Sequence, residues 1–231
     1  MPHLDFLTDE GRSVGACNTV FIREDENGNR LLCGTNTDTV GVRDAFYNNL
    51  TTDWEDAFFH GRPGLVLGGG GAARSAIYAL RQYMRVTDVY LVNRDAKETE
   101  AVINWWNAAH KDSANGENGG RIIHVTSVEQ AEALPAPGAV VACIPDFPPQ
   151  TPDEIMARRI FEAMMRKEEK GAVLEMCYNP TPWTEISHIA EREGWDVILG
   201  TEAMIWQGIE QVRSLTFDIC HPRNEQVYSM T

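Results

Sequence analysis

The sequence predicts an α/β protein whose main part is a doubly wound parallel sheet. The first observation is the run LVLGGGGAA at 65–73, where an apolar strand leads through four glycines into a helix-forming segment. The second is a series of short, apolar and β-branched runs at 89–92, 139–144 and 172–176. Such strands are buried on both faces, as in a parallel sheet covered by helices. Together these observations predict a Rossmann-type sheet.

Local signals predict the other elements. Asn-Gly at 27–28 lies between two strand-like runs and is a strong hairpin signal. In the last helical segment Met204, Ile205, Ile209 and Val212 predict one apolar face. In chain order the further predicted elements are a helix at 4–12, strands at 16–23 and 30–34, helices at 39–50 and 97–110, a strand at 121–125, a helix at 184–194, a strand at 196–199 and a helix at 201–216.

The glycine turn predicts a site for a dinucleotide. Its spacing is Gly68-x-Gly70-x-x-Ala73. The first glycine makes a tight turn, the second lets the backbone approach a pyrophosphate, and the third small residue lets helix and strand pack closely. Unpaired N–H groups at the helix start, including those of Gly71 and Ala72, attract the anion. The alternative is a turn that only closes a corner between strand and helix.

Polar residues after the next strand predict the ribose end of the same site. In such sheets this position lies about 20 residues past the glycines. Asn93 or Asp95 is predicted to accept hydrogen bonds from the ribose hydroxyls, and Arg94 to lie over the adenine face. The alternative is a solvated loop. Ile144 and Tyr178 follow two further strands at the same carboxyl edge, and are predicted to line the cofactor site. A nicotinamide cofactor, NAD or NADP, is the first hypothesis.

Length and composition are those of a globular protein of one or two domains. The chain has 231 residues, of which 43% are hydrophobic and 23% charged. A net charge of −14 predicts that nucleic acid is not a partner, because a phosphate backbone would be repelled. No long apolar run or secretory pattern occurs, which predicts no membrane association. Five cysteines without metal-ligand spacing predict reduced thiols, no metal site and a cytoplasmic protein.

Four sequence blocks occur in a specific order. They are GACNT at 15–19, GTNTDTVG at 34–41, the glycine turn with Asn93 and Arg94, and YNP at 178–180 followed by GTEAMIWQG at 200–208. This order resembles the shikimate and quinate dehydrogenase family, and most closely its fungal members. The resemblance implies an NAD(P)-dependent oxidoreductase of the shikimate pathway or of quinate metabolism. It would interconvert quinate and 3-dehydroquinate, or shikimate and 3-dehydroshikimate.

The resemblance also implies site residues. Asn18, Asp38 and Gln207 would bind the polyol, with Asp38 also catalytic, and Tyr178 would lie at the nicotinamide end of the cleft. Each of the first three has a structural alternative. Asn18 would close a turn, Asp38 would cap a helix, and Gln207 would be a solvated helix residue. The block order further predicts that the last helix crosses back and brings Gln207 beside Asp38.

The chain departs from the family pattern at its start. The family pairs its Asp with an upstream Lys, whereas the first lysine here is Lys97, in the nucleotide-binding part. We therefore expect the catalytic Lys to be absent, the α/β substrate domain to be truncated, and turnover by this chain alone to be low. The predicted domains are a remnant of the substrate-binding domain at 1–60, a Rossmann domain at 61–200, and a returning helix with a tail at 201–231.

A second departure concerns the cofactor. Asp95 stands where NADP-preferring relatives usually have Thr. A carboxylate accepts a hydrogen bond from a free 2′-hydroxyl and repels a phosphate dianion, so NAD is predicted to be preferred over NADP.

Two other functions fit the same residues. One is a regulatory protein without catalysis that resembles the fungal quinate repressor. The other is one module of a multifunctional shikimate-pathway polypeptide. In each case the expected ligand is a small polyol carboxylate, quinate or shikimate, and the oligomeric state is left open.

Overall fold

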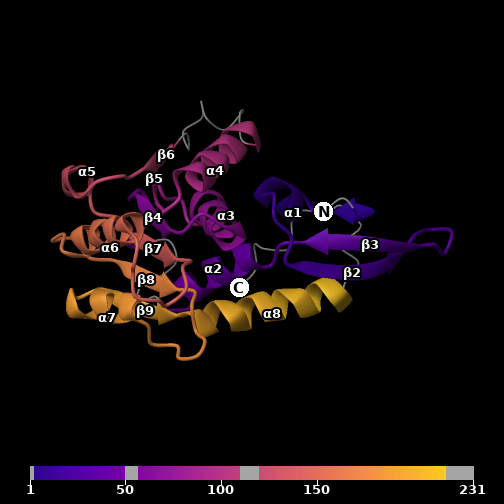
Figure 1. Ribbon diagram of the computed structural model, residues 1–231. Coiled ribbons are helices and arrows are strands. Elements are labelled where there is room, and N and C mark those ends of the chain that lie inside the picture. Colours follow the sequence, from indigo (N-terminus) through magenta and orange to yellow (C-terminus); the bar gives the residue numbers. More distant parts are fainter. Residues whose placement is uncertain (1–2, 50–56, 110–119, 217–231) are drawn as a thin grey trace.

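Two sheets organise the part of the chain that the structure describes (Figure 1). The computed structural model describes residues 3–49, 57–109 and 120–216. The larger sheet has six parallel strands in the order β6-β5-β4-β7-β8-β9. This is the order of doubly wound dinucleotide-binding sheets, so the predicted fold class is confirmed. The six strands are β4 (Gly64–Leu67), β5 (Val89–Val92), β6 (Ile122–His124), β7 (Ala139–Ala142), β8 (Ala172–Glu175) and β9 (Asp196–Leu199).

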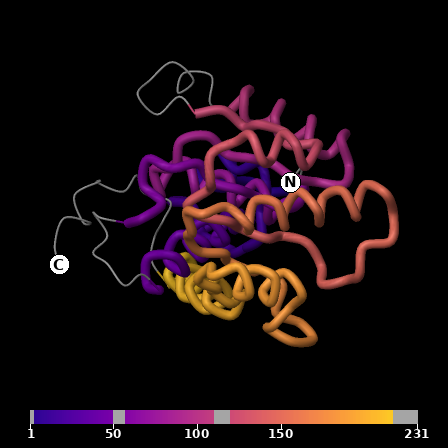
Figure 2. The backbone as a smooth tube through the Cα atoms, turned by 90° about the vertical axis from the view of Figure 1, so that its left-hand side faces the viewer, coloured from indigo at the N-terminus to yellow at the C-terminus, as the bar shows by residue number. Residues whose placement is uncertain are grey.

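Helices cover both faces of the larger sheet (Figures 1 and 2). Every residue of β4, β5, β7 and β8 is buried, and their side chains alternate between two cores. Val66 belongs to one core, whereas Leu65 and Leu67 belong to the other. The covering helices include α3 (Gly71–Tyr78) and α4 (Ala96–Ala109) at the first core, and α5 (Val128–Ala133), α6 (Pro152–Met165) and α7 (Glu185–Arg192) at the second.

The smaller sheet contains a hairpin and one added strand. Strands β2 (Thr19–Glu24) and β3 (Arg30–Thr35) are antiparallel, and β1 (Phe6–Leu7) pairs with β3 in parallel. At the hairpin turn, Asp25 Oδ1 accepts from the N–H groups of Asn27 at 2.9 Å and Asn29 at 2.7 Å. The predicted hairpin is therefore present, closed by an Asp side chain bonded to the backbone.

The predicted helix at 4–12 is wrong over its first half. Phe6–Leu7 is strand β1, and helix α1 spans Asp9–Val14. Thr8 Oγ1 accepts a hydrogen bond from Gly11 N–H at 3.2 Å, so Thr8 caps the helix and fixes its start. Pairing of β1 with the distant β3 holds the preceding residues extended.

Helices α2 (Asp38–Tyr47) and α8 (Gly200–Thr216) lie against each other and link the two sheets (Figure 1). Helix α8 follows β9 directly and reaches the smaller sheet, where Arg23 donates to the carbonyls of Ser214 and Leu215. The approach of the two helices is close, because a Cβ added to Gly41 would lie 2.7 Å from the Ala203 carbonyl oxygen. The last helix therefore does cross back to the N-terminal part.

The apolar face predicted for α8 is not buried against the rest of the described protein. Its four apolar side chains are 38% to 58% exposed, namely those of Met204, Ile205, Ile209 and Val212. The buried residues of α8 are the small Gly200, Ala203 and Ser214. Close contact with α2 is made by small residues, which an apolar pattern does not detect.

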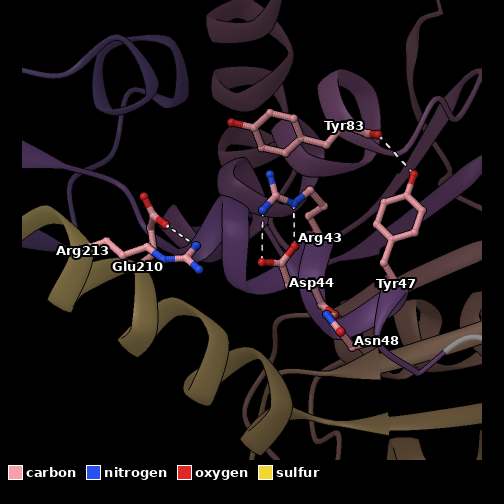
Figure 3. Close-up of polar contacts among 7 residues, drawn as sticks. All are labelled: Arg43, Asp44, Tyr47, Asn48, Tyr83, Glu210 and Arg213. Carbon is pink, nitrogen blue, oxygen red and sulfur yellow. Dashed lines mark hydrogen bonds and ion pairs between the residues drawn. The ribbon is translucent and has the colours of Figure 1, made fainter. Parts of the chain in front are cut away.

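Polar contacts hold α2 against the helix that follows the glycine turn (Figure 3). Within α2, Arg43 and its neighbour Asp44 form a two-point ion pair with N–O distances of 2.6 and 3.0 Å, and the Arg43 guanidinium lies 5.3 Å from the centre of the Tyr83 ring. Tyr47 donates to the Tyr83 carbonyl at 3.4 Å, and its hydroxyl lies 2.9 Å from His60 Nε2. Tyr83 ends a π-helical turn, Ala79–Tyr83, that continues α3. The end of α2 is thus held against the end of this turn, while Ser75 Oγ in α3 donates to Asn36 Oδ1 at 3.2 Å and joins the segment before α2 to α3.

Two further findings concern the whole of the described chain. No helix in residues 3–49, 57–109 and 120–216 has both the length and the apolar character to cross a membrane. Four cysteines lie in these ranges and none of them forms a disulfide there, while Cys220 lies outside the described residues.

Candidate functional site

A cavity of about 220 Å³ opens at the glycine turn. It lies at the carboxyl ends of β4, β5 and β7, at the point where the strand order reverses and where doubly wound sheets bind ligands. Its wall contains five of the residues that the sequence predicted to bind the cofactor, namely Gly68, Gly70, Asn93, Arg94 and Ile144. Residues that were not predicted also line it, among them Gly69, Glu98, Cys143, Phe147, Glu154 and Arg158.

A side chain at either of two positions of the glycine turn would disturb its surroundings. Gly68 has φ +124°, and an added Cβ would lie 3.0 Å from the Cys143 carbonyl oxygen. A Cβ on Gly69 would lie 2.3 Å from Asn93 Nδ2. Gly70 precedes the first residue of α3 and provides no side-chain cap, so the first N–H groups of α3 receive no side-chain acceptor there. This is the arrangement that binds a phosphate anion through the backbone.

Three predicted cofactor residues at the start of α3 are not on the wall of this cavity. Gly71 and Ala72 belong to the first turn of α3, and Ala73 is fully buried between helix and sheet. Burial of Ala73 agrees with the packing role that the glycine motif assigns to its last small residue.

Asp95 caps a helix. Its Oδ1 accepts hydrogen bonds from the N–H groups of Lys97 at 2.8 Å and Glu98 at 3.3 Å, at the start of α4. Asp95 is therefore beside the cavity and not on its wall. Asn93, on the wall, donates through Nδ2 to the Asp95 carbonyl and to Glu98 Oε2, both at 3.1 Å.

Arg94 forms an ion pair across the cavity mouth. Its Nη1 bonds to Oε1 of Glu154, the third residue of α6. Glu154 Oε2 accepts from the N–H groups of Gln150 at 2.9 Å and Thr151 at 3.0 Å. These backbone donors, with Arg94, lower the pKa of Glu154 to about 2. Glu154 is therefore a fixed negative charge beside Arg94.

A second cavity, of about 260 Å³, brings four predicted residues together. Asn18, Asp38, Tyr178 and Gln207 all line it, although they come from the loop before β2, the start of α2, the loop after β8 and α8. The other residues on its wall are Met176, Gly200, Ala203, Met204 and Gln211. Tyr178, which was predicted to contact both ligands, lines this cavity and not the first.

Thr37 connects three elements at this cavity. Its N–H donates to Asn18 Oδ1 at 3.0 Å, and its hydroxyl lies 3.1 Å from Asn18 Nδ2. The same hydroxyl lies 3.1 Å from Gln207 Oε1, which also accepts from Gln211 Nε2 at 2.7 Å. Asn18 therefore has a structural role here, and its amide is held in one orientation.

Asp38 is the first residue of α2 but does not cap it. Asn36 Oδ1 accepts the helix N–H of Thr39 at 3.3 Å, and Thr37 makes no side-chain cap bond. Burial raises the pKa of Asp38, and a hydrogen bond from Asn18 opposes that rise. A half-buried carboxylate with a raised pKa is a better proton acceptor than an exposed one.

Cys143 and Glu175 lie at the carboxyl ends of the paired strands β7 and β8. Burial raises the pKa of the Cys143 thiol, and the negative charges of Glu175 and Asp38 raise it further. A direct contact joins the regions of the two cavities, because Ser75 Oγ, in the helix after the glycine turn, donates to Asn36 Oδ1, two residues before Asp38, at 3.2 Å. Glu175, which is 1% exposed, accepts from Cys177 N–H at 2.8 Å and Thr184 Oγ1 at 3.0 Å, and so holds the loop that carries Tyr178.

Sequence signals existed for some of the residues that were missed. Glu154 is the last residue of TPDE at 151–154, which is a capping-box pattern, and the structure contains that box. Glu98 and Cys143 carry no such signal. No group of three or more His, Cys, Asp or Glu within the described ranges has the arrangement of a metal site.

Comparison with known proteins gives a family relationship. No family model matches the chain. A quinate dehydrogenase of Emericella nidulans is 44% identical over 220 residues, which are 94% of this chain and 65% of that protein. The chain thus spans slightly less than two thirds of this relative. The dehydroquinate dehydratase and shikimate dehydrogenase of S. pombe AroM matches at a TM-score of 0.71 and 27% identity, over 94% of this chain and 38% of that one.

More distant solved structures share the fold. Quinate dehydrogenase from Corynebacterium glutamicum in complex with NAD has a TM-score of 0.67 at 22% identity, over 94% of this chain and 68% of its own. A shikimate dehydrogenase in complex with NADP⁺ has a TM-score of 0.64 at 20% identity, over 94% of this chain and 66% of its own. The structures that share this fold thus include one complex with NAD and one with NADP⁺. By sequence and by fold, this chain is a homologue of the shikimate and quinate dehydrogenases.

Proposed function

We propose that this chain binds a nicotinamide dinucleotide at the glycine turn and provides the Asn18, Asp38 and Gln207 side of a polyol site. The reaction would be that of a quinate or shikimate dehydrogenase, the interconversion of a ring secondary alcohol and a ketone. The observation that carries the proposal is the meeting of these three side chains on one cavity. The segment before Asp38 contacts the helix after the glycine turn through Asn36 and Ser75. The 44% identity to a quinate dehydrogenase supports it.

The residues at the glycine turn fit a dinucleotide. A Cβ would be strained at Gly68 and would displace the Asn93 side chain at Gly69, and the start of α3 offers N–H groups without a side-chain acceptor. A pyrophosphate would bind against this turn, with the ribose near Asn93 and Asp95. When bound, the nicotinamide would accept a hydride from the carbinol carbon.

The residues of the second cavity would hold the polyol and take its proton. Asp38 would accept the hydroxyl proton as the hydride leaves the same carbon, because its raised pKa makes it a usable base. Asn18 and Gln207 would hydrogen-bond ring hydroxyls, and Tyr178 would close the side towards the cofactor. No lysine is among the described residues that line this cavity, so proton transfer there would depend on Asp38.

Two titrations test this function. The 231-residue chain is titrated first with NAD and then, with NAD saturating, with quinate and shikimate, while NADH formation is followed by absorbance. We expect Asp38→Asn to weaken polyol binding and to leave NAD binding unchanged. Asp9→Asn, on the exposed start of α1, is the matched control and is expected to change neither. Equal polyol binding by wild type and Asp38→Asn would contradict the assignment.

The turnover measurement separates two forms of the function. Loss of a general acid–base partner lowers a rate by about 10²–10⁴-fold, so we expect binding with little turnover from this chain alone. Binding without any turnover, even at high enzyme concentration, would favour a regulatory protein. The match to S. pombe AroM favours a further setting, in which the same domain is one module of a larger polypeptide.

NAD is the cofactor that we propose this chain prefers. Asp95 uses Oδ1 to cap α4, and its remaining carboxylate oxygen would accept a bond from the ribose 2′-hydroxyl. Asp95→Ser keeps a good helix cap and removes the charge. We expect this variant to bind NADP more tightly relative to NAD, measured by titration calorimetry. An unchanged ratio would contradict a role for Asp95. We also propose a cytoplasmic location, which is supported by the absence of disulfides among the four described cysteines.

A further inference from the structure

Arg94 raises a question that its sequence position leaves open. In doubly wound sheets an acidic residue after the second strand binds the 2′-hydroxyl of NAD, whereas an arginine there binds the 2′-phosphate of NADP. This chain has both, as Arg94 and Asp95 in succession. The cofactor that such a site accepts depends on whether the guanidinium of Arg94 is available.

The structure shows that Arg94 is already paired. Its Nη1 bonds to Glu154 Oε1, from a helix 60 residues later in the chain. Both side chains line the cavity of the glycine turn. Arg94 itself is 64% exposed, so without this partner its guanidinium would face the solvent at the cavity mouth.

Glu154 is held in place independently of Arg94. Its other oxygen, Oε2, accepts two backbone N–H groups in the capping box of α6, and its side chain is only 23% exposed. The carboxylate therefore does not swing away when a ligand approaches. With a pKa lowered to about 2, it keeps its charge at any working pH.

Two other carboxylates near Arg94 also disfavour the binding of a phosphate there. Glu98 lies on the cavity wall beside Asn93, and Asp153 lines an adjoining cavity together with Arg94. Arg158, the other cation on the described wall of this cavity, acts in the opposite direction. A phosphate dianion at Arg94 would thus meet the charge of Glu154 directly.

We propose that Glu154 is a specificity-determining residue that excludes NADP by occupying the guanidinium of Arg94. This inference rests on the proposed dinucleotide site and assigns its selectivity for NAD over NADP in part to Glu154. Discrimination of this kind comes from a repulsive element against the wrong ligand, in addition to contacts with the right one. It is separate from the role proposed for Asp95, because Glu154 lies on a different helix.

Glu154→Gln in the full chain tests the inference. Glutamine also serves at the third position of a capping box, so the start of α6 is retained while the charge is lost. We expect the Kd for NADP to fall by at least about fivefold, since one unit of negative charge beside a phosphate dianion is removed. The Kd for NAD is expected to stay within about twofold of the wild-type value. Both are measured by titration calorimetry at low salt.

Two further variants isolate the pair. Glu162→Gln is the matched control, because Glu162 forms a similar ion pair with Arg166 on the same helix and is not on the cavity wall. Arg94→Ala is expected to leave NADP binding nearly unchanged in the wild-type background and to abolish the gain in the Glu154→Gln background. The Glu154→Gln variant is also expected to bind 2′,5′-ADP, which carries the 2′-phosphate, more tightly than wild type does. Its affinity for 5′-AMP, which lacks that phosphate, is expected to stay unchanged.

The outcomes are distinct. If Glu154→Gln and Glu162→Gln bind NADP with the wild-type affinity while NAD binding is intact, the inference is wrong and the ion pair only anchors α6. If Arg94→Ala weakens NADP binding as much in wild type as in the Glu154→Gln variant, Arg94 is available despite Glu154, and the inference is again wrong. If the wild-type chain binds neither NAD nor NADP, the proposed function itself fails and this inference fails with it.

Discussion

Replacement of Glu175 by glutamine is expected to change how the stability of this protein depends on pH. Glu175 is the last residue of β8 and is 1% exposed. Burial raises its pKa to about 7, more than the hydrogen bonds from Cys177 N–H and Thr184 lower it. The negative charge of Asp146 adds to the rise, and the positive charge of Arg158 opposes it.

The sign and size of the effect follow from proton linkage. In the unfolded chain Glu175 ionises near its ordinary value of 4.5, and in the folded chain near 7. Between these pH values the folded state holds a proton that the unfolded state has lost, so the free energy of unfolding falls as the pH rises. The difference in pKa corresponds to about 3 kcal/mol in total. This contribution is fully present below pH 4.5 and absent above pH 7.

Glu175→Gln removes this dependence and keeps the shape of the side chain. Its amide can still accept from Cys177 N–H and can donate to Thr184 Oγ1. We expect the difference in unfolding free energy, variant minus wild type, to rise by about 3 kcal/mol between pH 4.5 and 7.5. Urea denaturation at several pH values in this range measures it. The difference between two proteins cancels the titration of all other groups.

Glu185→Gln, at the exposed first residue of α7, is the control and is expected to stay within about 0.5 kcal/mol of wild type throughout. Parallel stability curves for wild type and Glu175→Gln would refute the reasoning. They would mean that Glu175 ionises in the folded protein as it does in the unfolded one, with water reaching its carboxylate.

Two other predictions concern glycines. Gly41→Ala is expected to destabilise the protein by about 1–3 kcal/mol, because its Cβ would lie 2.7 Å from the Ala203 carbonyl oxygen, whereas Gly208→Ala, with no heavy atom within 4 Å, is expected to stabilise it by about 0.5–1 kcal/mol. Urea midpoints measure both, and equal effects would contradict the close approach of α2 and α8. Gly69→Ala is expected to weaken NAD binding at nearly unchanged stability, because the new Cβ displaces Asn93; wild-type affinity in calorimetry would contradict it.

The larger sheet could be predicted from the sequence because its strands are uniformly apolar and short. The strands predicted at 89–92 and 196–199 agree with β5 and β9 to the residue. Helix α6 was not predicted, although the capping box at Thr151 and Glu154 marks its start. The residues before Thr8 show the opposite case, since pairing of β1 with the distant strand β3 decides their structure.

In the candidate site, too, some features could be predicted from local sequence and others could not. The glycine turn is a local pattern, and its geometry follows from steric limits that the spacing reveals. The pairing of Arg94 with Glu154 is a contact over 60 residues, and nothing in either local sequence indicates it. For Asn18, Asp38 and Gln207, family resemblance supplied what local patterns could not, because side chains on a loop and on two helices converge only in three dimensions.

The hydroxyl of Thr37 contacts one residue that is synthesised early in translation and one that is synthesised late. It contacts Asn18 early in the chain and Gln207, which lies 170 residues later. During translation, the six-stranded sheet is complete once β9 has emerged, whereas the second cavity lacks one wall until α8 has formed and docked on α2. A contact of such high sequence separation forms late, since the loop entropy of the whole intervening chain must be overcome first. A nascent chain that stops before residue 200 would therefore hold the glycine turn without the cavity beside it, so dinucleotide binding would precede polyol binding in the life of each molecule.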